Sequence, residues 1–83
     1  MRKRLSAGKR TYTVVFEKEE GGYTVTVPML PGLVTEGRTL KEARTMAEDA
    51  IHCYLESLLK DGEPIPEETE VDIEKLEVEV PVS

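Results

Sequence analysis

The chain has 83 residues, of which 34% are charged, 39% hydrophobic and 5% aromatic, and its net charge is −6. This length allows one small domain with a thin core, and no apolar run approaches the roughly 20 residues that a membrane span requires. A lone cysteine, Cys53, excludes an intramolecular disulfide and a cysteine-based metal site. The composition therefore predicts a cytoplasmic protein without a cofactor. The absence of Asn and Gln is typical of heat-adapted proteins.

Charge is unevenly distributed along the chain. Residues 1–10 contain no acid and hold five of the eleven basic residues, namely Arg2, Lys3, Arg4, Lys9 and Arg10. The rest carries six basic and seventeen acidic residues, a net charge of −11. This asymmetry predicts a flexible basic tail over residues 1–9 and an acidic domain over residues 10–83. An acidic domain repels phosphates and favours a basic protein partner, so the five basic residues are only an alternative nucleic-acid contact.

Two alternating runs joined by glycines predict a β-hairpin at the start of the domain. Residues 10–18 and 23–27 place apolar side chains at every second position, which is typical of strands with one buried face. The Gly21-Gly22 pair between them fits a tight turn. Pro28 ends the second strand because proline cannot donate to the hydrogen-bond ladder.

A turn, a short strand and a helix are expected next. The Pro31-Gly32 pair marks the turn, and residues 33–36 form a third strand. Thr39 and Glu42 make a capping box, in which each side chain accepts a hydrogen bond from the backbone amide of the other residue. The helix should run from about Leu40 to about Lys60. Its apolar stripe recurs at helical spacing and consists of Leu40, Ala43, Ala47, Ala50, Ile51, Tyr54, Leu55 and Leu58.

The last alternating run, from Leu76 to Val82, predicts a fourth strand. The expected fold is α+β: a single small domain of order β-β-β-α-β, with a three-stranded antiparallel meander, one helix on one face and a fourth strand added to the sheet. One helix covers one face of a sheet. The other face or a free strand edge is then open to another chain, which predicts a homodimer or a higher homo-oligomer.

Candidate catalytic side chains do not form a recognisable set. His52 and Cys53 are adjacent on the helix and point about 100° apart, so they cannot act together. We expect His52 to face solvent with Glu48 and Glu56 as local charge partners. We expect Cys53 to be a small hydrophobic residue at the edge of the core. The sequence indicates no metal site and no enzyme.

Five short motifs follow one another between Tyr12 and Pro66. They are Gly22-Tyr23, Pro28-Met29-Leu30-Pro31-Gly32, Thr35-Glu36-Gly37-Arg38-Thr39, Glu42-Ala43 and Gly62-Glu63-Pro64-Ile65-Pro66. In this order and spacing the chain resembles the HicB-like antitoxin family. Met29 and Arg38 stand where the family often has an acid, and Leu33 where it often has a small residue or cysteine. These departures concern partner contacts rather than the fold.

The resemblance implies a partial RNase H-like unit without nuclease activity. It also implies a partner, a small basic HicA-like toxin that has a double-stranded-RNA-binding-like fold and cleaves mRNA. We therefore expect an antitoxin that binds and neutralises this toxin. The expected contact zone is the Pro-Gly loop with Met29, Leu30, Leu33 and Glu36. Many family members continue into a DNA-binding segment, for which this sequence has no room, so operator binding is not expected.

Two alternatives to the antitoxin role remain open at the level of the sequence. The exposed strand edge would suit an orphan module that only associates with itself. The basic residues at the start of the chain would suit a weak nucleic-acid binder.

Overall fold

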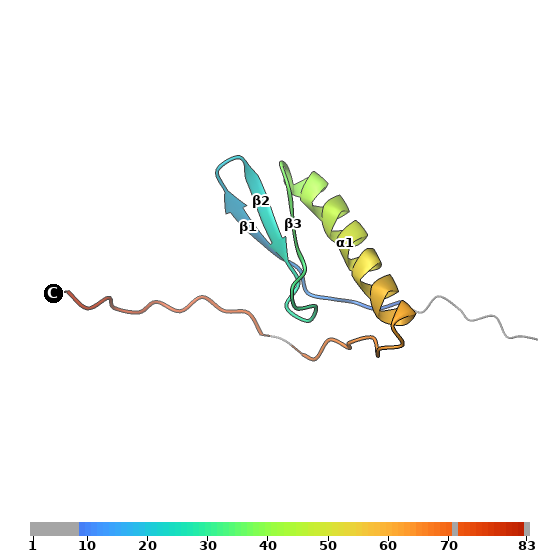
Figure 1. Ribbon diagram of the computed structural model, residues 1–83. Helices are drawn as coiled ribbons and strands as arrows, with labels where there is room; N and C mark the ends of the chain where they lie inside the picture. Colours follow the sequence, from blue (N-terminus) through green and yellow to red (C-terminus); the bar gives the residue numbers. More distant parts are fainter. Residues whose placement is uncertain (1–8, 71, 83) are drawn as a thin grey trace, which may run out of the picture.

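The computed structural model describes residues 9–70 and 72–82. A three-stranded sheet is followed in the chain by one helix: β1 (Val15–Glu19), β2 (Gly22–Thr26), β3 (Val34–Gly37) and α1 (Leu40–Lys60). The sheet order is β1-β2-β3, and α1 lies against one side of the sheet (Figure 1). This arrangement confirms an α+β domain built on a meander and one helix.

The β1–β2 hairpin is shorter than the alternating pattern suggests. Both strand pairs are antiparallel, and the β1–β2 ladder runs from Glu19 opposite Gly22 to Val15 opposite Thr26. The predicted start at residue 10 is wrong, because β1 begins at Val15. Two positions beyond Thr26 the partner strand reaches Pro28, which has no N–H to continue the ladder. Residues 10–14 therefore find other partners.

The start of α1 is capped as the sequence predicts, with one difference. The Glu42 amide donates to the Thr39 hydroxyl over 3.0 Å. The Glu42 carboxylate accepts from the amide of Arg38 over 2.6 Å, one residue earlier than the Thr39 amide that we expected. Both ends of the helix lie where predicted, at Leu40 and Lys60.

The core lies between α1 and the sheet and has two parts. One contains the buried residues Val25, Ala43 and Ala47, with Val14, Phe16 and Tyr23 partly buried against them. The other contains the buried residues Val27, Leu30 and Leu33, with Tyr12, Val14, Ala50, Ile51, Tyr54 and Leu55 partly buried against them. The apolar stripe of the helix therefore faces the sheet and the loop after β2, as expected.

Gly37 allows the helix to start directly against the sheet. A Cβ atom on Gly37 would lie 2.5 Å from the amide nitrogen of Ala43 and 2.7 Å from its Cα. A Cβ atom on Gly22, which precedes the Gly37 partner Tyr23 in β2, would meet the Gly37 carbonyl oxygen. Backbone therefore packs on backbone where β2, β3 and the first turn of α1 meet, and a side chain at Gly37 would push the helix away.

A set of polar contacts, here called the clasp, joins the segment before β1 to the segment after α1. The Tyr12 hydroxyl donates to the Pro66 carbonyl over 2.5 Å, and the Thr13 amide donates to the Glu68 carboxylate over 2.5 Å. The Thr13 hydroxyl donates to the same carboxylate. The clasp consists of Arg10, Tyr12 and Thr13 with Pro66, Glu67 and Glu68. It fixes the start of the C-terminal part beside the entry to β1.

The structure does not confirm the fourth strand expected near Leu76–Val82. The described residues 72–82, here called the C-terminal segment, belong to no strand and extend away from the sheet and helix (Figure 1). Four alternate side chains on the segment are between 74% and 95% exposed; these are Leu76, Val78, Val80 and Val82. The segment has the side-chain pattern of a strand, but it pairs with no strand within residues 9–70 and 72–82.

Membrane insertion through a helix finds no support in the described residues. Within residues 9–70 and 72–82, no helix combines the length and the apolar character of a membrane-spanning segment.

Candidate partner-binding site

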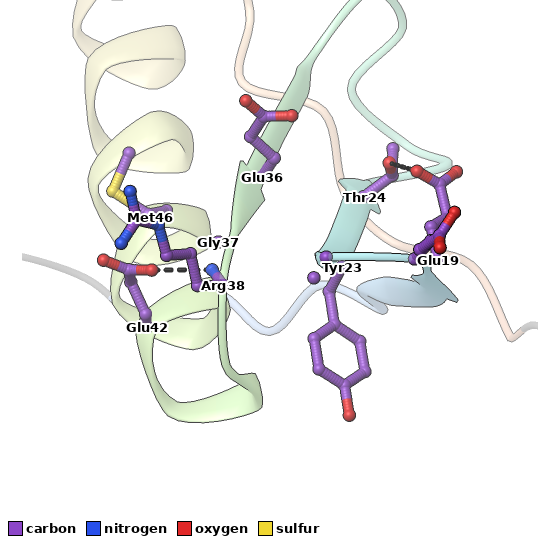
Figure 2. A pocket seen from close by; sticks show the side chains of 11 residues that line it. Glu19, Tyr23, Thr24, Glu36, Gly37, Arg38, Glu42 and Met46 are labelled. Carbon is purple, nitrogen blue, oxygen red and sulfur yellow. Dashed lines mark hydrogen bonds between the residues drawn. The ribbon is translucent and has the colours of Figure 1, made fainter.

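A cleft of about 420 Å³ opens where the β1–β2 turn, the end of β3 and the first turns of α1 meet (Figure 2). The residues that line it are Glu19, Glu20, Gly21, Gly22, Tyr23, Thr24, Glu36, Gly37, Arg38, Glu42 and Met46. Three glycines are among them, at the β1–β2 turn and at the end of β3. Met46, which is 39% exposed, adds an apolar patch on the helix side.

Negative charge dominates the cleft. Four exposed glutamates line it, Glu19, Glu20, Glu36 and Glu42, against one arginine, Arg38. The Glu19 carboxylate accepts a hydrogen bond of 2.9 Å from the Thr24 hydroxyl, and the Glu42 carboxylate is held by the Arg38 amide. Figure 2 shows these two fixed carboxylates on separate elements, the hairpin and the helix start. The arrangement suits a cationic side chain with some apolar length, such as lysine or arginine.

The local fold brings these glutamates together from distant parts of the sequence. Thr24 and Glu36 are direct partners in the β2–β3 ladder, so their side chains share one face of the sheet. Glu19 ends β1, Glu20 lies in the hairpin turn, and the capping interactions hold Glu42 at the start of α1; all three line the cleft. Of these four glutamates the sequence predicted only Glu36 as a contact residue.

The four predicted contact residues do not share one surface. Glu36 is exposed and lines the cleft, and Met29 is half-buried in the loop after β2. Leu30 is fully buried and Leu33 is 7% exposed. We therefore assign Leu30 and Leu33 to the core and keep Met29 and Glu36 as candidate contacts.

The burial of these leucines follows from how the loop folds. The Leu30 amide donates to the Val27 carbonyl over 2.9 Å, and the Leu33 amide donates to the Leu30 carbonyl over 3.1 Å. These two consecutive turns direct both leucines toward the helix. The Tyr54 hydroxyl then donates to the Pro31 carbonyl over 2.9 Å and fastens the loop to α1. In the sequence, the signal for burial is that Leu30 and Leu33 are three residues apart and flank the Pro31-Gly32 pair.

The candidate nucleic-acid contacts are only partly within the described residues. Arg2, Lys3 and Arg4 lie outside them, while Lys9 and Arg10 are exposed. The Arg10 guanidinium lies 3.3 Å from the Glu67 carboxylate within the clasp. Its charge is thus partly compensated inside the domain, which does not favour phosphate binding.

The contacts of His52 and Cys53 are local and do not indicate a catalytic pair. His52 Nε2 lies 3.3 Å from the Glu56 carboxylate, which confirms one of its two expected partners; the described contacts of His52 do not include Glu48. Cys53 is exposed, so its expected place at the edge of the core is wrong. The sheet and loop cover the side of α1 that carries Ala47 and Tyr54, and Cys53 lies about 100° round the helix from Tyr54. Among the described residues no cluster of three or more His, Cys, Asp or Glu could hold a metal ion.

Sequence comparison identifies relatives of the chain. Residues 12–80 match the profile of a family described as HicB_like antitoxin of bacterial toxin-antitoxin system. That range includes all three strands, α1, every clasp residue except Arg10 and most of the C-terminal segment. The family match therefore covers both the cleft and the exposed segment.

Individual relatives agree with this match. A UPF0150 protein of Thermoplasma acidophilum is 48% identical over 63 residues, which cover 75% of this chain and 91% of the relative. A UPF0150 protein of Synechocystis sp. is 45% identical over 58 residues, or 69% of this chain and 73% of the relative. Antitoxin HicB 1 of Photorhabdus laumondii is 45% identical over 56 residues, which cover 66% of this chain and 36% of that protein.

Proposed function

Since this chain belongs to the HicB-like antitoxin family, we propose that it binds a small basic HicA-like toxin and prevents that toxin from cleaving mRNA. Membership of the family supports an antitoxin role. That the partner is a HicA-like toxin which cleaves mRNA is our proposal. The chain acts in this proposal by binding and not by catalysis. Because the target of the toxin is mRNA, the place of action is the cytoplasm.

The observation that carries the proposal is the acidic cleft. An RNA-cleaving protein needs a basic surface to hold phosphates, and four exposed glutamates around one cleft complement such a surface. A lysine or arginine of the toxin would enter between the hairpin turn and the start of α1. Its charge would face a carboxylate of the cleft such as that of Glu42, and its apolar stem would lie on Met46.

Neutralisation then follows from competition for one surface. A toxin side chain held in the cleft cannot contact RNA phosphates, so the antitoxin displaces the substrate by occupying its binding site. The net charge of −11 outside residues 1–10 would speed the encounter with a basic partner. Met29, half-buried in the loop after β2, would add an apolar contact.

Binding to a purified small basic HicA-like toxin tests the proposal, and the product of the open reading frame next to this gene is the first candidate if it proves to be small and basic. We expect the two proteins to copurify and the chain to protect RNA from cleavage in a purified assay. The double variant Glu20→Lys with Glu36→Lys should weaken binding by at least about tenfold, because it puts two like charges before a cationic partner. Titration calorimetry at two salt concentrations measures this change.

A matched variant separates the cleft from the overall charge. Asp49→Lys with Glu63→Lys makes the same change in net charge at exposed positions outside the cleft. We expect it to weaken binding by less than about threefold. Equal weakening by both double variants would show that the cleft is not the contact, and cleavage of RNA in the saturated complex would contradict neutralisation.

We also propose that the C-terminal segment supplies a fourth strand beside a β1 strand, either its own or that of a second copy. Either addition would complete a partial RNase H-like sheet, in which a fourth strand follows the order β-β-β-α. The exposed apolar side chains of the segment support it, since burying a row of alternate apolar residues against a second surface is favourable.

A further inference from the structure

The C-terminal segment carries an apolar face that its own domain leaves uncovered. Leu76, Val78 and Val80 are 77%, 74% and 78% exposed. The charged residues Glu77 and Glu79 alternate with them, so the opposite face of the segment is acidic. In an extended chain this pattern puts all apolar side chains on one side. A small domain that exposes such a row is prepared to pair with another strand.

An open acceptor lies along β1. This strand is at the edge of the sheet, since the order is β1-β2-β3. Beside it, a groove of about 440 Å³ separates the chain before β1 from α1. Tyr12, Val14, Ile51 and Leu55 form its apolar part, and the rim carries Arg10, Glu48 and His52. Phe16, partly buried, continues the apolar row along β1.

The clasp argues against pairing between the segment and β1 of the same chain. It places Glu68 beside Thr13, an offset of 55 residues. A strand that continued from there alongside β1 at the same rise per residue would bring Leu76 to the level of Gly21, in the hairpin turn. The row from Leu76 to Val82 would then extend beyond the sheet.

From this offset we propose that the segment from Leu76 to Val82 pairs with β1 of a second copy of the chain, and that the two copies exchange these segments. The apolar row enters the groove of the second copy beside Val14 and Phe16, and Glu77 and Glu79 face solvent. Each copy donates one strand and accepts one, which gives a closed two-fold dimer. The inference builds on the fourth strand proposed above and does not involve the toxin.

The dimensions of donor and acceptor agree. Seven residues from Leu76 to Val82 span about 23 Å as a strand, and the stretch from Val14 to Glu19 spans about 20 Å. Leu76, Val78 and Val80 recur at every second position, as do Val14 and Phe16. The extended course of the segment away from its own domain (Figure 1) makes it available to a neighbour.

Light scattering after size-exclusion chromatography tests the exchange on the full chain. We expect a mass twice that of the 9.3 kDa chain. Val78→Ser with Val80→Ser should shift the dissociation constant of the dimer at least 100-fold and give monomers at micromolar concentration. Glu77→Ser with Glu79→Ser alters the same segment on its other face and should leave the dimer intact.

Folding of the variants is checked by circular dichroism. The sheet, α1 and the core of the described structure do not include residues 76–82, so all variants should keep the helical signal. A monomeric full chain would overturn the proposal, and so would a dimer that survives the Val78→Ser and Val80→Ser changes.

Disulfide cross-linking distinguishes exchange from pairing within one chain. In a Cys53→Ser background, Glu17→Cys marks the middle of β1 and Glu79→Cys marks the middle of the donated strand. Mixing the two single-cysteine chains, one carrying a mass tag, should give a linked heterodimer. A chain with both cysteines that cross-links only within itself would overturn the exchange. Neither assay contains a toxin, so failure here leaves the antitoxin proposal untouched.

Discussion

β2 and the C-terminal segment have the same alternating pattern and opposite surroundings. In β2, Val25 is fully buried between the sheet and α1. In the segment, Val78 is 74% exposed, although its neighbours in sequence alternate in the same way. The pattern of a strand therefore specifies which face is apolar, and it does not specify what covers that face.

The difference arises from chain connectivity. A two-residue turn leads from β1 to β2, and a short loop leads from β2 to β3, so both partners of β2 are supplied at low entropic cost. The C-terminal segment follows the clasp at the end of a much longer connection, and in the described structure it pairs with neither edge strand of the sheet. A strand that follows a short turn thus finds its partner, whereas the C-terminal segment, with an equally regular pattern, follows a long connection and is unpaired in the described structure.

Loss of a core leucine should give the largest contrast between the two regions. Leu30→Ala removes a fully buried side chain and should cost about 2–5 kcal/mol of unfolding free energy. Leu76→Ala, at a side chain that is 77% exposed, should change it by less than about 0.5 kcal/mol in dilute monomeric protein. Urea unfolding measures both values, and similar losses would mean that the segment packs within its own domain.

A methyl group at Gly37 should have the next largest effect. Gly37→Ala places a Cβ atom against the backbone of Ala43, so the first turn of α1 has to shift. We expect a loss of about 1–3 kcal/mol from this overpacking. Glu36→Ala, one residue earlier and exposed, is the matched control and should stay within about 0.5 kcal/mol. Equal values in thermal unfolding would show that the helix does not depend on this contact.

Removal of the clasp carboxylate should have a smaller effect and tests the junction between the two regions. Glu68→Ala leaves the amide and hydroxyl of Thr13 without their acceptor and should cost about 1.5 kcal/mol. It should also increase hydrogen exchange at the Thr13 amide. Glu67→Ala removes only an exposed ion pair with Arg10 and should cost less than about 0.5 kcal/mol. Unchanged exchange at Thr13 in the Glu68 variant would contradict this role.

The sequence best predicts those features that depend on residues close together in the chain, such as the bounds of a helix. The cap at Thr39, the apolar stripe and the stop after Lys60 all lie within or beside α1, and its bounds were confirmed. The start of β1 depends on Pro28 in the partner strand, which the run of residues 10–18 does not reveal. The fourth strand depends on a partner that no local pattern identifies.

The candidate site shows the same limit. The glutamates of the cleft are up to 23 positions apart and meet only when the hairpin, β3 and α1 assemble. The pattern around Pro31 suggested an exposed loop, whereas the turns at Leu30 and Leu33 place both leucines in the core. Side chains that seem available in a loop can thus be the ones that hold the loop in place.

The clasp has a consequence for the order of folding. Its hydrogen bonds join residues 54 to 57 positions apart, whereas the hairpin and α1 form through contacts between near neighbours. Closing so long a loop costs more chain entropy, so we expect the clasp to form after the sheet and helix. Its loss should accelerate unfolding while leaving the folding rate nearly unchanged. The entry to β1 would then be the first part of the domain to open.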